Sequence, residues 1–376
     1  KRRTDLDKSL PTTLVWKELA DPKPAHILTR GAYDKKGEQV YRNTPASLPP
    51  LPPLSEGETP NRLHLARWLV SPEHPLTARV TVNRFWQQYF GTGIVETTED
   101  FGSQGSPPSH PDLLEWLAID FRESGWDVQR LQKMIVMSAT YRQASRVSPE
   151  MIERDRANRM LSRGPRFRTD AEVIRDTALA VSGLLVRKTG GPSVKPYQPP
   201  GIWYAVGYTD SNTAKFTRDN GEALYRRSMY TFWKRTAPPP TMSTLDAPSR
   251  ENCTVRRSRT NTPLAALALM NDEQFVEASR AFAQRAMKEG GKTDEQRAAY
   301  AFRLALTRKP TEAELAVLLD VYRANLAKYR SDTGAATKLI NIGDSKPDEK
   351  LDPSQLAAWT MIGNLILNLD ETMTKS

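Results

Sequence analysis

Helical periodicity breaks off in the middle of this chain, and the break limits the folds that the chain can adopt. Residues 190–262 are rich in Pro, Tyr, Trp and Arg and lack a regular spacing of apolar side chains. Before and after them, as at 170–186, apolar residues recur at helical spacing, which places them on one face of a helix. The sequence therefore predicts a mainly α fold: a helical domain with small β elements and a long irregular insert rich in Arg and aromatic residues.

We expect the chain to consist of four segments. The first contains a proline-rich stretch at 44–60, which is typical of an irregular strap on the surface. The four are an extended N-terminal strap with short strands (1–60), a helical region (61–189), an irregular Arg/Trp/Tyr-rich segment with a buried strand (190–262), and a C-terminal helical region that packs on the first (263–376).

Capping residues, prolines and glycines mark where the predicted helices begin and end. Asp127 is placed to cap one helix, Gly91 to end another, and the Gly190-Gly191 pair to follow a third. A polar stretch at 331–352 is interpreted as a linker. The predicted helices are 61–69, 75–90, 109–124, 127–141, 170–186, 263–270, 272–289, 294–306, 311–329 and 353–369, and the predicted strands are 12–16, 26–29 and 229–233.

The net charge of the chain indicates which classes of partner it could bind. The formal net charge of +10 favours polyanionic partners through long-range attraction; a basic surface that serves only solubility is the alternative. No nucleic-acid-binding motif is visible, so we expect no nucleic acid as a partner.

The sequence also predicts no membrane span, because no run approaches the about 18 apolar residues that are needed to cross a bilayer. The chain has one cysteine and no C-x-x-C-H motif, so neither an internal disulfide nor attached haem is expected.

The irregular segment holds the main candidate for a binding site. Arginines and aromatic residues alternate there, and this mixture suits an anionic or sugar ligand, because guanidinium forks bind carboxylate or sulfate and ring faces stack on sugars. The same residues would also stabilise a loop-rich segment through ion pairs and stacking, and both interpretations stay open. The candidate ligand-binding residues are Trp203, Arg226, Arg227, Trp233, Arg235, Arg250 and Arg256.

A catalytic alternative lies in the same segment. Asp246 and Glu251 are candidates for the two carboxylates of a glycosidase, which lie roughly 5 to 10 Å apart. Neutralisation of neighbouring arginines is the simpler role for both. Cys253 would need a basic neighbour to act as a nucleophile, and all four histidines lie in the first third of the chain.

Metal-binding patterns are sparse. Glu99 and Asp100 sit in a polar, glycine-containing loop and are the candidates for a hard cation, with a rigid capping loop as the alternative. The histidines, at positions 26, 64, 74 and 110, do not have the spacing of a zinc site. We therefore expect no metal in this chain.

Several motifs carry a family resemblance over nearly the whole chain. They are the block 61–126, GGPSVKPYQPPGIW at 190–203, LYRRSMYTFWKR at 224–235 and SRTNTPLAALALMND at 258–272. Together they resemble the planctomycete-specific domain of unknown function that follows planctomycete cytochrome c modules in large exported proteins. Ala32 and His64 depart from that family's pattern. The resemblance implies a periplasmic, cell-surface or secreted location, haem on an upstream module, and a C-terminal position in a longer precursor.

Two functional hypotheses follow. The first is a binding and assembly domain that engages a partner protein, an upstream cytochrome c module or an anionic polysaccharide. The second is a polysaccharide-acting enzyme, hydrolytic or redox-coupled, with its site in residues 190–262. The absence of recognisable catalytic motifs favours the first, and the density of polar and aromatic residues in the insert favours the second.

Because the chain lacks both C-x-x-C-H and metal-spaced His and Cys residues, we predict that the purified chain binds neither haem nor zinc. Elemental analysis should find less than one equivalent of iron or zinc. Either metal in stoichiometric amount would contradict this prediction.

Overall fold

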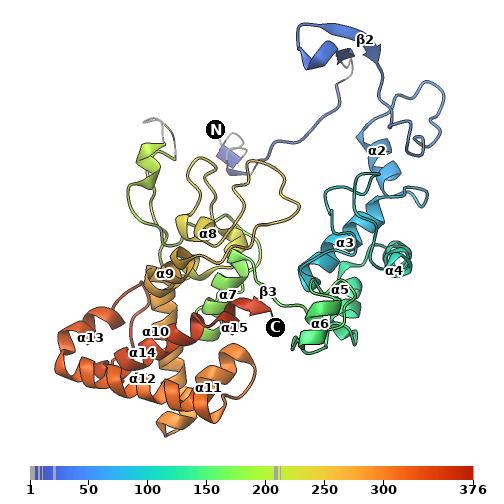
Figure 1. The fold of residues 1–376 in the computed structure, drawn as a ribbon. Coiled ribbons are helices and arrows are strands. Elements are labelled where there is room, and N and C mark those ends of the chain that lie inside the picture. Colours follow the sequence, from blue (N-terminus) through green and yellow to red (C-terminus); the bar gives the residue numbers. More distant parts are fainter. Residues whose placement is uncertain are drawn as a thin grey trace. The chain divides into compact units, whose positions relative to one another are not determined.

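The computed structural model describes residues 5–6, 9–10, 12–19, 23–206, 211 and 213–375 (Figure 1). The fold is mainly α with small antiparallel β elements, as the sequence predicts. The chain divides into two compact units. Unit 1 comprises residues 1–87 and 93–134, and unit 2 comprises residues 88–92 and 135–376.

Unit 1 combines a β hairpin with short helices. The strands of the hairpin pair antiparallel, with Ala25 opposite Val40. Asn61 caps the first helix: its side chain accepts hydrogen bonds from the backbone N–H groups of Leu63 and His64, as expected for a helix start. The elements are β1 (Ala25–Leu28), η1 (Thr29–Gly31), β2 (Lys36–Val40), α2 (Arg62–Leu69), α3 (Thr77–Phe90), α4 (Pro111–Glu123) and α5 (Val128–Met137), the last residues of α3 and α5 belonging to unit 2.

The strand predictions for unit 1 are correct only in part. The strand predicted at 26–29 corresponds to β1, but residues 12–16 form no strand, and Trp16 is 89% exposed. A strand requires a neighbour that supplies ladder hydrogen bonds. β1 obtains one from β2 across a short turn, whereas 12–16 has no such neighbour among the described residues.

Unit 2 is built around two long buried helices, α10 and α14. α10 is buried along most of its length, and Trp359, Ile362 and Ile366 of α14 are each at most 1% exposed. The apolar character of the last helix therefore predicts its burial correctly. Gly363 permits close contact between the two helices, because a Cβ atom at this position would lie 2.7 Å from the Ser279 carbonyl oxygen.

Most of the other α-helices of unit 2 pack against this pair, and a two-stranded sheet joins β3 to the C-terminal β4. The elements are α6 (Pro149–Arg154), β3 (Phe167–Arg168), α7 (Ala171–Ser182), η2 (Ile202–Ala205), η3 (Gly221–Tyr225), η4 (Ser228–Tyr230), α8 (Pro240–Thr244), α9 (Pro263–Asn271), α10 (Glu273–Glu289), α11 (Asp294–Leu306), α12 (Glu312–Ser331), α13 (Thr333–Ile340), α14 (Pro353–Leu367), α15 (Asp370–Met373) and β4 (Thr374–Lys375).

The buried strand predicted at 229–233 is wrong. The chain forms the short helix η4 there, Met229 is 64% exposed, and Thr231 makes only an isolated bridge to Val194. Aromatic and β-branched residues favour strands only where a neighbouring strand can pair with them. Here the chain turns after each short contact, so no ladder develops.

Two helix boundaries also differ from the predictions. α7 ends at Ser182, where Gly183 adopts a left-handed conformation with φ 82°, and not at 186 as predicted. The predicted linker at 331–352 contains α13, whose start is capped by the Asp332 side chain on the N–H of Ala335 at 2.8 Å. Ala336 and Ile340 fix α13 in the core. Their helical spacing within the TGAATKLI sequence is obscured by the polar residues on either side of it.

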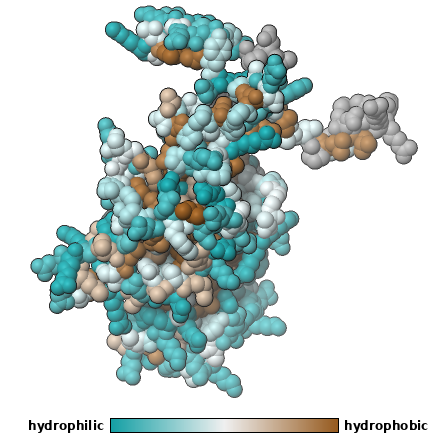
Figure 2. Space-filling view, turned by 90° about the vertical axis from the view of Figure 1, so that its right-hand side faces the viewer, coloured by the Kyte–Doolittle hydropathy of each residue, from teal (hydrophilic) through white to brown (hydrophobic). Residues whose placement is uncertain are grey.

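The exposed surface in Figure 2 is mostly hydrophilic, with separate apolar patches. None of the helices in the described ranges has both the length and the apolar character that crossing a membrane requires. This agrees with the prediction of no membrane span for that part of the chain.

The fold predicts that Gly343→Ala destabilises unit 2. Gly343 has φ 96°, and an added Cβ would lie 2.3 Å from the Glu277 Cδ atom. Backbone strain and overpacking together should lower the free energy of unfolding by about 2–4 kcal/mol, measured by urea denaturation. Gly221→Ala is the control: its φ is 60° and nothing lies within 4 Å of an added Cβ, so about 1 kcal/mol is expected. Equal losses would show that the contact with Glu277 is unimportant.

Candidate functional site

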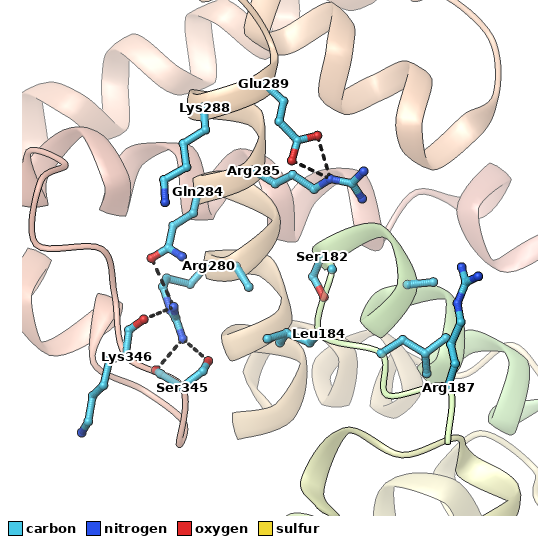
Figure 3. A pocket seen from close by; sticks show the side chains of 14 residues that line it. Ser182, Leu184, Arg187, Arg280, Gln284, Arg285, Lys288, Glu289, Ser345 and Lys346 are labelled. Atoms are coloured by element: carbon cyan, nitrogen blue, oxygen red, sulfur yellow. Dashed lines mark hydrogen bonds and ion pairs between the residues drawn. The ribbon is translucent and has the colours of Figure 1, made fainter. Parts of the chain in front are cut away.

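A groove of about 660 Å³ opens on the surface of unit 2 (Figure 3). It lies between α10, the segment that follows α7, and the loop that precedes α14. Its lining residues are Ala180, Ser182, Gly183, Leu184, Leu185, Arg187, Arg280, Ala281, Gln284, Arg285, Lys288, Glu289, Ser345 and Lys346.

The floor of the groove is held by a buried arginine, Arg280, which is 1% exposed. Its Nη1 donates to the Gln284 side chain and to the Lys346 carbonyl, both at 3.2 Å. Its Nη2 donates to the carbonyl oxygen of Ser345 at 2.7 Å and to the Ser345 hydroxyl at 2.5 Å. Arg280 therefore fixes the loop that carries Ser345 and Lys346 against α10.

Behind the floor, Glu277 is fully buried and accepts hydrogen bonds from three segments. The hydroxyls of Tyr197 and Tyr225 each donate to its carboxylate at 2.8 Å. Ser345 donates both its backbone N–H, at 2.7 Å, and its hydroxyl, at 2.6 Å. Buried charge is costly unless it is hydrogen-bonded, and here the donors come from the insert and from the loop.

The tyrosines in this network stay protonated. Burial, and then the hydrogen bond to Glu277, raise the pKa of Tyr225 to about 12. The same two causes, in the same order, raise the pKa of Tyr197 well above its usual range. Burial lowers the pKa of Arg280, although Glu277 lies 3.8 Å from its Nη2. The network therefore supplies donors to one carboxylate and is not arranged for proton transfer at neutral pH.

The cations on the walls differ in their partners. Arg285 pairs with Glu289 at 3.0 Å and donates to the Val181 carbonyl at 3.1 Å, and Lys288 forms an ion pair with Asp348. Arg187 and Lys346 are exposed, and neither side chain has a partner within the described part of the chain. In the view of Figure 3 these two side chains lie on opposite sides of the groove.

The lining favours an anion. It contains five basic side chains and a single acidic one. Guanidinium and ammonium groups bind carboxylate, sulfate and phosphate through charge-assisted hydrogen bonds. The lining contains no aromatic side chain, so a ligand would be held by charge and not by ring stacking. The single carboxylate of the lining, Glu289, is paired with Arg285 at 3.0 Å.

Two of the predicted ligand-binding residues are buried. Trp203 is 2% exposed and packs against Phe216 and Phe232. Arg226 is 6% exposed; it donates to the carbonyls of Pro192 and Gly190 and stacks on the ring of Tyr230. Both side chains stabilise the insert, which corresponds to the structural interpretation of the Arg/aromatic pattern.

The other predicted ligand-binding residues lie at the surface or partly so. Trp233 is half-buried, its indole N–H donates to the Ser249 carbonyl at 2.9 Å, and Arg250 stacks on its ring. Arg235 pairs with Glu251 at 3.6 Å, and both are exposed. Arg227 and Arg256 are also exposed. None of the seven residues lines the groove, and a ligand role for the exposed ones stays a prediction.

Asp246 does not resemble a catalytic acid. Its carboxylate forms an ion pair with Arg168 and accepts hydrogen bonds from the Thr260 N–H at 2.7 Å and the Thr260 hydroxyl. Burial raises the pKa of this carboxyl, but the hydrogen bonds from Thr260 and the charge of Arg168 outweigh it, so that the pKa lies below its usual value. Glu251 is about half exposed. Asp246 thus anchors the loop that precedes α9.

The metal candidates, Glu99 and Asp100, lie in a loop that is held by local hydrogen bonds. Asp100 accepts a hydrogen bond from the Gly102 N–H at 2.7 Å, and the Thr97 hydroxyl donates to its carbonyl. Within the described ranges no cluster of three metal-ligating side chains occurs. His64 belongs to the cap of α2, where its Nδ1 accepts from the Asn61 N–H at 3.2 Å. Cys253 is an exposed free thiol.

Sequence reasoning missed the groove. Its residues come from a helix interpreted as ordinary packing and from a stretch interpreted as a polar linker. One signal was present: Glu277 and Arg280 stand three positions apart in the middle of a helix that is rich in Ala and Phe. Charges at core positions of a helix require buried partners, and these partners mark the groove floor.

Comparison with known proteins identifies a family. Residues 61–322, more than half of the chain, match the model of PSD1, a protein of unknown function (DUF1553), and the chain belongs to this family. No curated protein and no solved structure matches the chain. The family description carries no activity, so function has to be argued from the groove.

The anchoring role of Asp246 predicts that Asp246→Asn lowers stability at neutral pH. Asparagine tolerates the left-handed φ of 64° at this position, so the change isolates the charge. Loss of charge-assisted hydrogen bonds should reduce the free energy of unfolding by about 2–3 kcal/mol.

The pH dependence gives a second check on Asp246. The folded-state pKa lies below the ordinary value of 3.8, so the stabilisation is present above about pH 4 and is lost as the pH falls through the folded-state pKa. Denaturation of wild type and variant at several pH values should therefore converge in acid. Asp320→Asn, at a side chain that is 75% exposed, serves as the control and should change stability by less than about 0.5 kcal/mol.

Proposed function

We propose that this PSD1-family chain is a binding domain that holds an anionic polysaccharide in the groove beside Arg280. One observation carries the proposal: Arg187 and Lys346 lie on opposite sides of the groove without partners in the described part of the chain, and the floor between them is held by the hydrogen bonds of Arg280. Because this floor is already ordered before a ligand arrives, binding requires little rearrangement of the backbone around the groove.

The charge balance supports an acidic ligand. Arg285 and Lys288 already have acidic partners at the rim, so the two unpaired cations provide the excess charge. A guanidinium binds carboxylate or sulfate through two parallel hydrogen bonds, and an ammonium acts as a mobile point charge. The formal net charge of +10 adds long-range attraction for polyanions.

The size of the groove favours part of a polymer over a single small anion. Its volume of about 660 Å³ is in the range of clefts that hold drug-sized organic molecules. Because its lining has no aromatic ring, neutral glycans would lack their usual stacking surface. The ligand class is therefore a carboxylated or sulfated polysaccharide. A periplasmic or cell-surface location, and an upstream cytochrome c module, are parts of this proposal.

The enzymatic alternative has less support. Of its two candidate carboxylates, Asp246 is saturated by Arg168 and Thr260, and Glu251 is paired with Arg235 at the surface. Neither is an unpaired acid held in a cleft, which a glycosidase mechanism would need. We therefore assign the chain a binding role.

Reversal of the two free charges tests the proposal. The variant Arg187→Glu/Lys346→Glu should bind heparin, a sulfated polysaccharide used as the probe, at least 10-fold more weakly than wild type, a loss of about 1.4 kcal/mol or more. Isothermal titration at several salt concentrations should show affinity that falls as salt rises in wild type and falls less in the variant. Neutral dextran should not bind either protein.

A matched control separates the groove from net charge. Arg330 and Lys338 are exposed on α12 and α13 and do not line the groove, so Arg330→Glu/Lys338→Glu changes the net charge equally. It should retain nearly full heparin affinity. Equal losses in both double variants would refute the groove as the binding site.

A further inference from the structure

Helix α9 exposes an apolar face that unit 2 does not use. Its sequence, PLAALALMN, is apolar on all sides. Ala265 and Leu269 are buried, but Leu264 is 59%, Leu267 57% and Met270 49% exposed. The three exposed side chains are spaced three residues apart, so they form one stripe along the helix. A helix that is apolar all round is normally covered on all sides.

The stripe is held in a fixed position. The Thr262 side chain caps the N-terminus of α9 at the Ala265 N–H, at 3.2 Å. At the other end, the Asn364 side chain donates to the Met270 carbonyl at 3.2 Å. Because the first turn of α9 is capped by Thr262 and its last turn is hydrogen-bonded to α14, exposure of the three side chains is not the result of a frayed helix.

The loop that leads into α9 is also fastened. Arg250 stacks on the Trp233 ring, 4.5 Å from its centre, and Arg257 pairs with Glu172 at 2.6 Å. Arg259 stacks on Phe167 at 4.3 Å. Between these anchors, residues 251–256 are all exposed. The loop 249–262 therefore holds an exposed segment, residues 251–256, in a fixed position just before α9 in the sequence.

The charge of this region is strongly one-sided. Residues 249–271 contain four arginines and one acidic residue, Glu251. A surface that combines an apolar stripe with a cationic border suits a partner with apolar side chains and carboxylates. A second copy of the chain fits less well, because a two-fold contact would place the arginines of both copies opposite each other.

We infer that α9 and the loop 249–262 form a docking surface for an acidic partner protein. The partner places apolar side chains on Leu264, Leu267 and Met270 and carboxylates beside the arginines of the loop. This surface is separate from the groove, since none of its residues lines that groove, and it adds protein recognition to the proposed polysaccharide binding.

The cysteine of the chain provides a reporter for the test. Cys253 is the single cysteine in the sequence, is exposed, and lies within the exposed segment 251–256. An environment-sensitive fluorophore can therefore be attached at this position alone. The probe is a synthetic amphipathic helix of about 20 residues with Leu on one face and Glu on the other. Wild type should show a saturable fluorescence shift, and a scrambled peptide of the same composition should bind at least 10-fold more weakly.

A substitution within the stripe tests its part in docking. Leu267→Asp should weaken binding of the amphipathic probe at least 10-fold without changing the melting temperature, because the side chain is exposed. Val317→Asp is the matched control, since Val317 is 59% exposed on α12 and should leave binding unchanged. Leu267→Gln, which adds no charge, should also weaken binding if apolar contact is required.

Several results would overturn the inference. They are equal binding of the ordered and scrambled peptides, unchanged binding by Leu267→Asp, tighter binding to vesicles of anionic phospholipid than to the peptide, or self-association that Leu267→Asp abolishes. The Arg187→Glu/Lys346→Glu variant should bind the peptide normally. If the polysaccharide proposal fails, the docking proposal is therefore unaffected. If the docking proposal fails, the polysaccharide proposal is likewise unaffected.

Discussion

The buried carboxylate of Glu277 is the interaction on which the arrangement of unit 2 depends. It accepts hydrogen bonds from Tyr197 and Tyr225 of the insert and from Ser345 of the loop before α14. An isolated buried carboxylate would be strongly destabilising, so the three segments must meet at this point for α10 to be buried. One side chain thereby joins parts of the chain that are far apart in sequence.

The groove is a consequence of that junction. Arg280 completes the network by binding both Ser345 and the Lys346 carbonyl, and this fixes the wall that carries the Lys346 side chain. The distinction between paired and unpaired cations decides what the groove offers to a ligand. Arg285 and Lys288 are satisfied by acidic neighbours, whereas Arg187 on the opposite wall is not. The binding proposal rests on this asymmetry and not on the number of basic residues.

The irregular insert shows why arginine and aromatic density alone is a poor guide to a site. A segment that contains only short helical turns leaves many backbone carbonyls unpaired, and long guanidinium groups satisfy them. Arg226 donates to carbonyls at Pro192 and Gly190, and Arg175 of α7 to those of Leu224 and Arg226. Arginine side chains thus stabilise the segment where regular secondary structure is short.

The sequence by itself determined the mainly α fold, the approximate positions of most helices and the burial of the last helix, because capping and apolar periodicity depend on residues within a few positions of each other. Only the tertiary structure decided that 229–233 forms no strand, that α13 interrupts a polar stretch, and that Arg187 and Lys346 line one groove. Those outcomes depend on partners supplied by distant segments. A strand needs a neighbour, a weak helix needs a core to pack on, and a binding groove needs charges from separate walls, and none of these is encoded in local spacing.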